Sequence, residues 1–343
     1  MATVTNQGRV TTTTQDFFLP NLVDIVLNSN VFFTRIVAKA KKWRGEQLKF
    51  PMKHVKNTNG SSFQGDDLLS TSSTDNRDRF AYDPAFYSIP AKVNDDEQSV
   101  NATADGFLNL VELAVQGAAE DMADDLGTIF YQDGTGNSSK DPLGLEAIVD
   151  DGTNTATLGG LTRSSFAGSV LDSTVTASGG TLTIAKMDTL YSAITSGSQK
   201  PTAGYSDQTV WDLYGQLIRS EERIPKDVPM MKAGIVAGTG FTGLFYRGFP
   251  LLADEKATSG VLYFLNEDWI DWHGLQVARK QPIKFTDQIS GNDYSASMNL
   301  GFSWSGWIQP INQASMISHI YFAGNLVTRN PKRHGKLTGI TGI

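Results

Sequence analysis

The chain has 343 residues, of which 40% are hydrophobic and 19% are charged, and its formal net charge is -7. It contains no cysteine, which excludes disulfides, thiolate metal sites and cysteine nucleophiles, and no apolar run approaches the roughly 18 residues of a membrane-spanning helix. The charges are segregated, because residues 39–56 hold seven lysines and arginines against one glutamate, whereas residues 94–133 hold ten carboxylates and no lysine or arginine. Segments of opposite sign are expected to meet one another or to meet a partner.

The N-terminal stretch is predicted to be an arm. Residues 1–16 are rich in threonine and show no hydrophobic periodicity, which is typical of an extended segment. From Pro20 to Trp43 the apolar residues are spaced as in two short helices, divided near residues 28–30. A helix lying on a membrane surface is the alternative, but Asp24 interrupts its apolar face. We therefore expect these helices to dock on protein.

A long hairpin is predicted next. Residues 46–55 alternate apolar and polar side chains with one basic face, and residues 79–93 are predicted to be the returning strand after a polar connection. Prolines in both strands are typical of sheet edges. Because an isolated hairpin is marginal in water, we expect another copy of the chain to cover it. The candidate subunit-contact residues of the hairpin are Lys49, Phe50, Lys53, Phe86 and Ile89.

The strongest helical pattern spans residues 101–132, where apolar side chains recur every three or four positions. Carboxylates crowd the opposite face of this helix. Paired carboxylates could bind a divalent metal or act in glycoside hydrolysis, but no second acidic helix and no nearby histidine supports either site. We favour a stripe that faces solvent or a partner, and its contact candidates are Glu120, Asp121, Asp124 and Asp125.

The stretch KDPLGLEAIVDDGTNTATLGGLTRS, residues 140–164, raises the question of a phosphate-binding loop because it is rich in glycine. Such a loop follows a buried strand and opens a helix. This stretch follows a helical pattern instead, lacks Gly-Lys-Ser/Thr and carries three aspartates that would repel phosphate. We therefore interpret Gly144, Gly159 and Gly160 as architectural turns.

The rest of the chain mixes helices and strands without regular βαβ spacing. Residues 183–195 and 206–223 are predicted to be helices of ordinary length. Residues 243–274 are predicted to be strands joined by Gly-Phe-Pro and Ala-Thr-Ser-Gly turns, and residues 295–320 a further strand region rich in aromatic residues. The predicted fold class is therefore α+β.

No catalytic residue, cofactor-binding residue or metal ligand is predicted. The four histidines are far apart, and His54 and His334 are expected to be exposed on a basic strand and in a basic tail. The glycine pattern at 234–243 is not followed by the helix that a dinucleotide fingerprint requires. The six tryptophans could form a platform for sugars or bases, but their acidic or neutral neighbours favour core packing and subunit contact.

The order of these features resembles one known family. An N-terminal arm precedes a long basic-edged hairpin, a long helix leads into DPLGL and GGLTR, and two helices precede YRGFPLLADEKATSGVLYFLN at residues 246–266. This order resembles the major capsid protein of tailed bacteriophages, whose fold is shared with encapsulins and the herpesvirus capsid floor. The resemblance implies an N-terminal arm at 1–42, an E-loop hairpin at 43–95, a P domain at 96–184 with its spine helix at 101–132, an A domain at 185–280, and C-terminal strands returning to the P domain, with a basic tail, at 281–343.

The resemblance also implies a function without catalysis or cofactors. The chain would self-assemble into hexamers and pentamers of an icosahedral phage head in the cytoplasm of a host bacterium. The head would enclose double-stranded DNA without sequence specificity, and no membrane would be involved. Scaffolding, portal and decoration proteins are candidate partners. An encapsulin-like compartment and a β-rich glycan-binding protein are the alternatives. Four residues match the turn pattern of the family's A domain and would shape loops there, namely Gly248, Pro250, Asp254 and Asn266.

Overall fold

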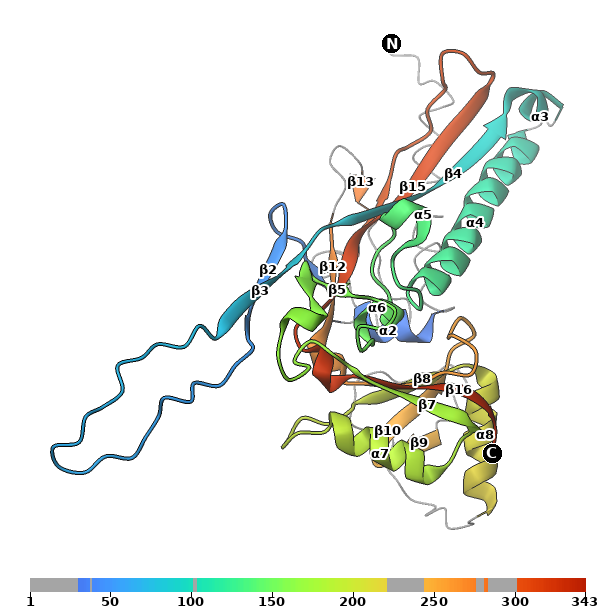
Figure 1. Ribbon diagram of the computed structural model, residues 1–343. Coiled ribbons are helices and arrows are strands. Elements are labelled where there is room, and N and C mark those ends of the chain that lie inside the picture. Colours follow the sequence, from blue (N-terminus) through green and yellow to red (C-terminus); the bar gives the residue numbers. More distant parts are fainter. Residues whose placement is uncertain (1–29, 38, 101–103, 221–243, 276–280, 283–300) are drawn as a thin grey trace.

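The described residues form two packed bodies, each built on a six-stranded sheet, and a long hairpin that projects away from both (Figure 1). The fold is mixed α+β, as the sequence predicts. The predicted arm at 1–16, the first of the two short helices and the glycine pattern at 234–243 lie outside the described residues. The computed structural model describes residues 30–37, 39–100, 104–220, 244–275, 281–282 and 301–343.

The first sheet is organised around the long strand β15 (Ser315–Thr328). β15 pairs antiparallel with β4 (Ala85–Asn94) from one end of β4 to the other, and it also pairs with β12 and β14. The remaining strands of this sheet are β1 (Lys41–Lys42), β12 (Ile270–Gly274), β13 (Gln281–Pro282) and β14 (Phe302–Trp304).

The long helix predicted at 101–132 is confirmed as α4 (Ala104–Ile129), which runs alongside β4 (Figure 1). Its apolar stripe, from Val111 to Ile129, is buried, and alternate side chains of β4 are buried as well. Burial of an amphipathic face against a sheet supplies most of the stability of such a helix. Within the described parts of the chain, no helix combines the length and apolar character needed to cross a membrane.

Aromatic residues from several elements fill the core of the first body. Phe33 of α2 (Val31–Val37) stacks on Phe130 with 4.5 Å between ring centroids, and Trp272 stacks on Phe322 at 4.8 Å. Packing in a core, rather than a platform for ligands, is therefore the role of the tryptophans that are buried in the described structure, namely Trp43, Trp272 and Trp304.

The second sheet has the strand order β7-β16-β11-β8-β10-β9 and packs against α7 (Ile184–Ile194) and α8 (Gln208–Ser220). Both helices lie where the sequence predicts them, and the Thr183 side chain caps α7 by accepting from the Lys186 backbone N–H. The strands are β7 (Thr174–Thr181), β8 (Ala203–Ser206), β9 (Leu244–Tyr246), β10 (Phe249–Ala253), β11 (Leu262–Leu265) and β16 (Gly335–Gly342).

Some strands pair in a different sheet from the one that their expected domain range implies. β7 falls in the range 96–184, yet it pairs with β16 in the second sheet. β12 falls in the range 185–280, yet it pairs with β15 in the first sheet. Pairing between strands far apart in the sequence decides which body a strand joins, so contiguous ranges do not describe either body.

The C-terminal stretch is not a basic tail. The turn η3 (Pro331–Arg333) leads into β16, which lies between β7 and β11 in the second sheet instead of returning to the first. Lys336 is buried there, and burial lowers the pKa of its ammonium group, against the opposing effect of the Asp150 carboxylate. His334 is fully buried and His54 is half-buried, so the expected exposure of both histidines was wrong.

The buried His334 makes the stability of the fold depend on pH. Its Nδ1 accepts from the Asn266 backbone N–H at 3.3 Å, and burial lowers the pKa of the ring from 6.5 to about 3. Because the folded state binds the proton less well than the unfolded state, this stabilisation is complete above about pH 6.5 and is lost as the pH falls toward about 3. Each pH unit below about 6.5 removes about 1.4 kcal/mol. The unfolding free energy is therefore about 2 kcal/mol lower at about pH 5 than above about pH 6.5.

Urea denaturation across this pH range measures the effect. The side chain of the variant His334→Gln does not titrate in this range. Its unfolding free energy is therefore expected to decline less between about pH 8 and about pH 5 than that of the wild type. An equal decline in both proteins would show that His334 is not the group responsible.

The base of the projecting hairpin consists of β2 (Leu48–Lys53) and β3 (Arg77–Tyr82), paired antiparallel. The predicted returning strand is thus divided, because its second half is β4 of the first sheet. A third apolar cluster covers the base, so the chain itself supplies a second layer there and only the outer loop lacks one. The buried members of this cluster are Trp43, Leu48, Met52, Phe80, Tyr82, Leu158, Leu171 and Val327.

Glycines allow two close approaches of the backbone, one at this base and one at the end of α4. Gly159 and Gly160, at φ +54° and +74°, turn the chain between β5 (Thr157–Leu158) and β6 (Leu161–Thr162), and a Cβ at Gly159 would lie 2.9 Å from the Tyr82 ring. A Cβ at Gly144 would lie 2.4 Å from the Gln132 backbone oxygen. These contacts agree with the architectural interpretation. The remaining short elements are α3 (Asp95–Val100), α5 (Gly136–Ser139), α6 (Leu145–Ile148), η1 (Arg163–Ser165) and η2 (Glu267–Trp269).

Candidate functional site

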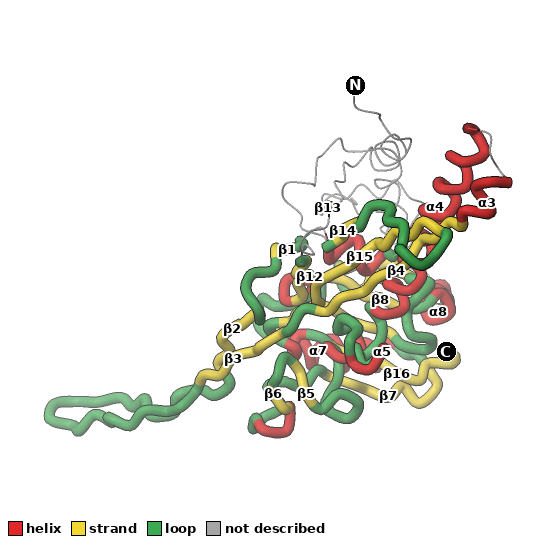
Figure 2. Tube along the Cα trace, turned by 90° about the horizontal axis from the view of Figure 1, so that it is seen from above, coloured by secondary structure: helices red, strands yellow, loops and turns green. Residues whose placement is uncertain are grey.

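The outer part of the hairpin, residues 54–76, is here called the hairpin loop. It extends away from both bodies in two perpendicular views (Figures 1 and 2). None of the residues from 57 to 74 is buried, and hydrogen bonds such as that from Asn59 Nδ2 to the Ser72 carbonyl, at 3.0 Å, join its two sides. Ordering an extended segment costs conformational entropy, and this loop buries little of its own surface to offset that cost.

Three apolar side chains are exposed near the tip of the hairpin loop. Phe63 is 66% exposed, Leu68 is 99% exposed and Leu69 is 58% exposed. Exposed apolar side chains that gather in one place mark an interaction surface. They were not among the predicted contact residues, because the loop as a whole is polar. The signal that could have found them is the presence of apolar residues in a segment otherwise made of Asn, Gly, Ser, Thr and Asp.

The predicted contact residues of the hairpin lie in different environments. Lys49 and Lys53 are exposed on β2. Phe50 is half-buried, with its ring 5.8 Å from that of His273. Phe86 is 55% exposed on β4. Ile89 is buried in the core of the first body, because the alternation of β4 turns it inward, so it is not accessible to another copy.

The predicted carboxylate stripe on α4 is partly used within the chain. Asp124 forms an ion pair with Lys256, from the loop after β10. Asp125 accepts from the Tyr87 hydroxyl at 2.5 Å, and burial together with this carboxylate raises the pKa of Tyr87. Glu120 and Asp121 are exposed, and Glu120 accepts from the Gln116 side-chain amide at 3.2 Å. Neither of these two carboxylates forms an ion pair with a residue that the structure describes.

The predicted turn residues shape the backbone in different ways. Gly248, at φ +90°, lies in the turn between β9 and β10, and Pro250 lies in β10. Asp254 is buried and accepts from the Phe32 backbone N–H at 3.2 Å, and its burial raises the pKa of the carboxyl. The Asn266 side chain caps η2 by accepting from the backbone N–H two residues later. Gly248 and Asn266 act within their own turns, whereas Asp254 joins the turn after β10 to α2.

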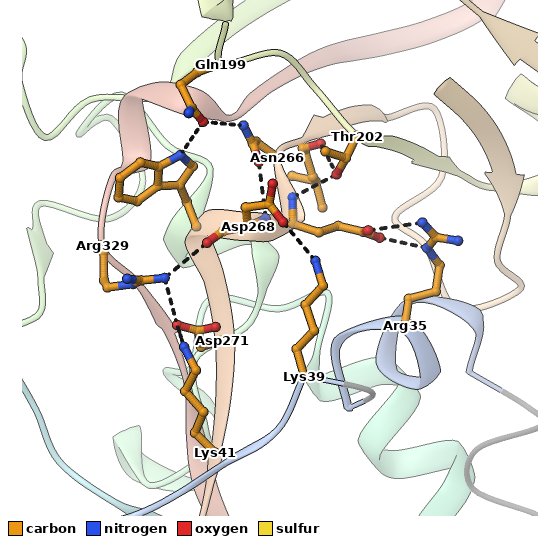
Figure 3. Close-up of polar contacts among 12 residues, drawn as sticks. Arg35, Lys39, Lys41, Gln199, Thr202, Asn266, Asp268, Asp271 and Arg329 are labelled. Atoms are coloured by element: carbon orange, nitrogen blue, oxygen red, sulfur yellow. Dashed lines mark hydrogen bonds and ion pairs between the residues drawn. The ribbon is translucent and has the colours of Figure 1, made fainter. Parts of the chain in front are cut away.

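A cluster of ion pairs, here called the ionic clamp, ties Arg35, Lys39 and Lys41 to carboxylates at residues 267–271 (Figure 3). Arg35 donates to both carboxylate oxygens of Glu267, at 2.7 and 3.0 Å. The Tyr205 hydroxyl donates to the same carboxylate at 2.5 Å. Glu267 and Asp268 lie between β11 and β12, where the chain passes from the second sheet to the first, and Asp271 lies in β12. The further pairs are Lys39–Asp268, Lys41–Asp271 and Arg329–Asp271.

The ionic clamp changes the interpretation of the basic run at 39–56. Lys39 and Lys41 are neutralised by carboxylates of their own chain, whereas the run had been expected to meet the acidic segment or a partner.

Among the residues that the structure describes, no group of three or more His, Asp or Glu side chains is placed to hold a metal ion.

Comparisons with known proteins identify the fold. No family model matches the sequence, and no curated protein matches it. The capsid asymmetric unit of cyanophage A-1(L) matches with a TM-score of 0.67 and 15% identity, over 91% of this chain and 93% of that chain. The SrpI encapsulin of Synechococcus elongatus PCC 7942 matches with a TM-score of 0.55 and 11% identity, over 90% of this chain and 87% of that chain.

The capsid of a native GTA particle also matches, with a TM-score of 0.53 and 11% identity, over 89% of either chain. Identities this low demonstrate a shared fold and nothing beyond it. The chain therefore has the fold that tailed-phage capsid proteins and encapsulins share, as the order of its sequence features indicated.

Proposed function

We propose that this chain is the major shell subunit of a tailed-phage head, a structural protein without catalytic activity. Copies would associate into hexamers and pentamers and close around double-stranded DNA. The observation that supports this most directly is the hairpin loop, which is extended, unburied and apolar at its tip. An exposed segment of this kind does not stabilise an isolated subunit, whereas in a shell a neighbouring subunit covers it.

The hairpin makes this association head-to-tail. A contact between two different surfaces of identical chains generates rings when the rotation closes. Burying an apolar side chain contributes about 1.5–3 kcal/mol, whereas an exposed ion pair contributes about 0–1 kcal/mol. Phe63, Leu68 and Leu69 would therefore supply most of the adhesion, while Lys49 and Lys53, facing Glu120 and Asp121 of a neighbour, would guide the register.

An encapsulin-like compartment is the second candidate, because the SrpI encapsulin has the same fold. The long polar hairpin loop favours the phage shell. Neighbouring genes separate the two candidates, since portal and terminase genes beside this one support a phage head and a gene for a cargo enzyme supports a compartment.

Negative-stain electron microscopy of the purified chain tests the common part of the proposal. We expect polyhedral shells, or free hexamers and pentamers that assemble as the protein concentration rises. A compact monomer at high concentration that binds a glycan would overturn the proposal in favour of the β-rich glycan-binding protein.

A further inference from the structure

A pocket of about 460 Å³ lies beside β1 and β2, at the foot of the hairpin. None of the described residues that line it is a carboxylate, although the whole chain has more carboxylates than lysines and arginines. Its volume falls within the range of about 300–1,000 Å³ that is usual for sites of small organic ligands. Its walls include Lys41, Lys42, Arg44, Leu48, Phe50 and His273.

Two of the cations on the pocket wall are not used within the described chain. Lys41 donates to Asp271 at 2.8 Å as part of the ionic clamp (Figure 3). Lys42 and Arg44 are exposed, and neither forms an ion pair with a residue that the structure describes. A guanidinium presents its donors in a planar fork that matches two oxygens of a phosphate, and a lysine ammonium binds phosphate as a point charge. Together these two side chains suit a phosphate group.

His273 adds an unpaired polar group to the wall. It lies opposite Lys41 in the parallel pairing of β1 with β12 and is only 6% exposed. Neither ring nitrogen makes a hydrogen bond of good geometry with the residues that the structure describes. Burial lowers the pKa of the ring, against the opposing effect of the Asp271 carboxylate, so the ring is neutral at pH 7 and carries one N–H donor. A ligand oxygen that accepts from this N–H would explain why the chain leaves the donor unpaired.

The apolar part of the pocket is aromatic. Phe50 is half-buried, and its ring lies 5.8 Å from the ring of His273. Leu48 lies on the same face of β2, because side chains alternate along a strand. Partly exposed aromatic rings are the surfaces on which proteins stack unpaired nucleobases. The pocket therefore offers a ring for stacking in the same cavity as two free cations.

We propose that this pocket binds a nucleoside phosphate, with its phosphate held by Lys42 and Arg44 and its base placed against Phe50. A free mononucleotide and an unpaired nucleotide of a single strand both present this chemistry. Duplex DNA does not, because its bases are enclosed in the double helix and two free cations are too few for a track along its backbone. The site goes beyond the shell function and does not depend on it.

An acidic protein segment is the rival occupant, because carboxylates pair with arginine and lysine as phosphates do. The Phe50 ring favours the nucleotide, since a planar base covers an aromatic face more completely than the aliphatic stem of Asp or Glu does. A glutamate-rich peptide in the binding experiments distinguishes the two occupants.

Titration of the purified full-length chain with a fluorescent derivative of adenosine monophosphate (AMP) tests the ligand class. We expect saturable binding that AMP displaces, whereas adenosine and inorganic phosphate, which each lack one half of the ligand, displace it at least about tenfold less well. Displacement by a single strand of thymidines would identify strands as a source of the ligand, and its failure would restrict the site to free nucleotides. Absence of AMP binding at millimolar concentration, or displacement by a duplex or by the glutamate-rich peptide as effective as that by AMP, would overturn the inference.

Matched charge variants locate the site. The variant Lys42→Ala, Arg44→Ala is expected to bind AMP at least about tenfold more weakly, because it loses both phosphate contacts. The control Arg77→Ala, Arg79→Ala removes the same charge from exposed positions of β3 that do not line the pocket, and it is expected to bind AMP as the wild type does. Equal weakening in the two variants would show that the ligand responds to the overall charge of the hairpin base and does not occupy the pocket.

The variant Phe50→Leu tests the contact with the base. It keeps an apolar side chain and removes the ring, so AMP is expected to bind about fivefold or more weakly, while inorganic phosphate binds as it does to the wild type. A purely structural role of Phe50 would weaken both ligands alike. That result, or no change for either ligand, would contradict the placement of a base in this pocket.

These outcomes are distinguishable from failure of the shell function. Polyhedral particles that bind no AMP would leave the shell function standing and sink the nucleotide site. A chain that forms no particles but binds AMP through Lys42 and Arg44 would keep the site and sink the shell function.

Discussion

Deleting residues 57–74 is expected to leave a folded, soluble subunit that no longer closes into shells. The deletion removes no buried residue. It joins Lys56 to Asp75 in a short connection of a length that hairpins commonly use, and the closing bond from the His54 backbone N–H to the Asn76 carbonyl, at 3.1 Å, remains possible. The apolar cluster under the hairpin base lies wholly outside the deletion.

Two measurements on the deletion variant check this expectation. Its thermal midpoint should stay within a few degrees of that of the wild type, because the variant loses only exposed segments. Electron microscopy and light scattering should find subunits or small oligomers in place of shells. The matched control is Thr71→Ala, Ser73→Ala, which alters the loop but keeps its apolar tip and should assemble normally. Intact shells from the deletion variant would contradict the role given to the hairpin loop.

Replacing Trp272 by alanine is expected to destabilise the first body by about 3–5 kcal/mol, the usual cost of deleting a large buried aromatic side chain. Trp272 is fully buried, stacks on Phe322 and meets the edges of Phe33 and Phe130. It therefore joins β12, β15, α2 and the end of α4. Because whole domains are stable by only about 5–15 kcal/mol, this is a large share of the total.

Urea denaturation measures this loss, and Trp272→Phe is expected to lose less because it retains a stacking ring. Phe86→Ala is the matched control, since this aromatic side chain is 55% exposed and its removal should change the unfolding free energy by less than about 0.5 kcal/mol. A loss at Trp272 no greater than that at Phe86 would contradict the central place given to the aromatic core.

Local signals made much of the fold predictable. The apolar spacing that predicted α4, α7 and α8 depends on residues three and four apart, so it is visible in the sequence alone. The turns at Gly159 and Gly160 were predictable for the same reason, because the backbone conformation there belongs to the glycines themselves. The order of these local features was enough to indicate the capsid fold.

The features that differ from the sequence-based expectations depend on pairing between residues far apart in the chain. The basic run from Lys39 has the composition of a partner-binding segment, but carboxylates more than two hundred residues later take up two of its charges. His334 and Lys336 have the composition of an exposed tail, but Lys336 lies in β16, between two strands from elsewhere in the chain, and His334 is buried directly before that strand.

Periodicity and backbone preference act over a few residues, so the sequence alone was enough to predict the helices α4, α7 and α8 and the turn at Gly159 and Gly160, whereas β7 was not predicted and the stretch that contains β16 was expected to be a tail. Which charges are paired within the chain, and which apolar side chains stay exposed, became apparent only from the folded structure. Those properties depend on what each residue meets in space, and residues distant in the sequence supply almost all of those contacts.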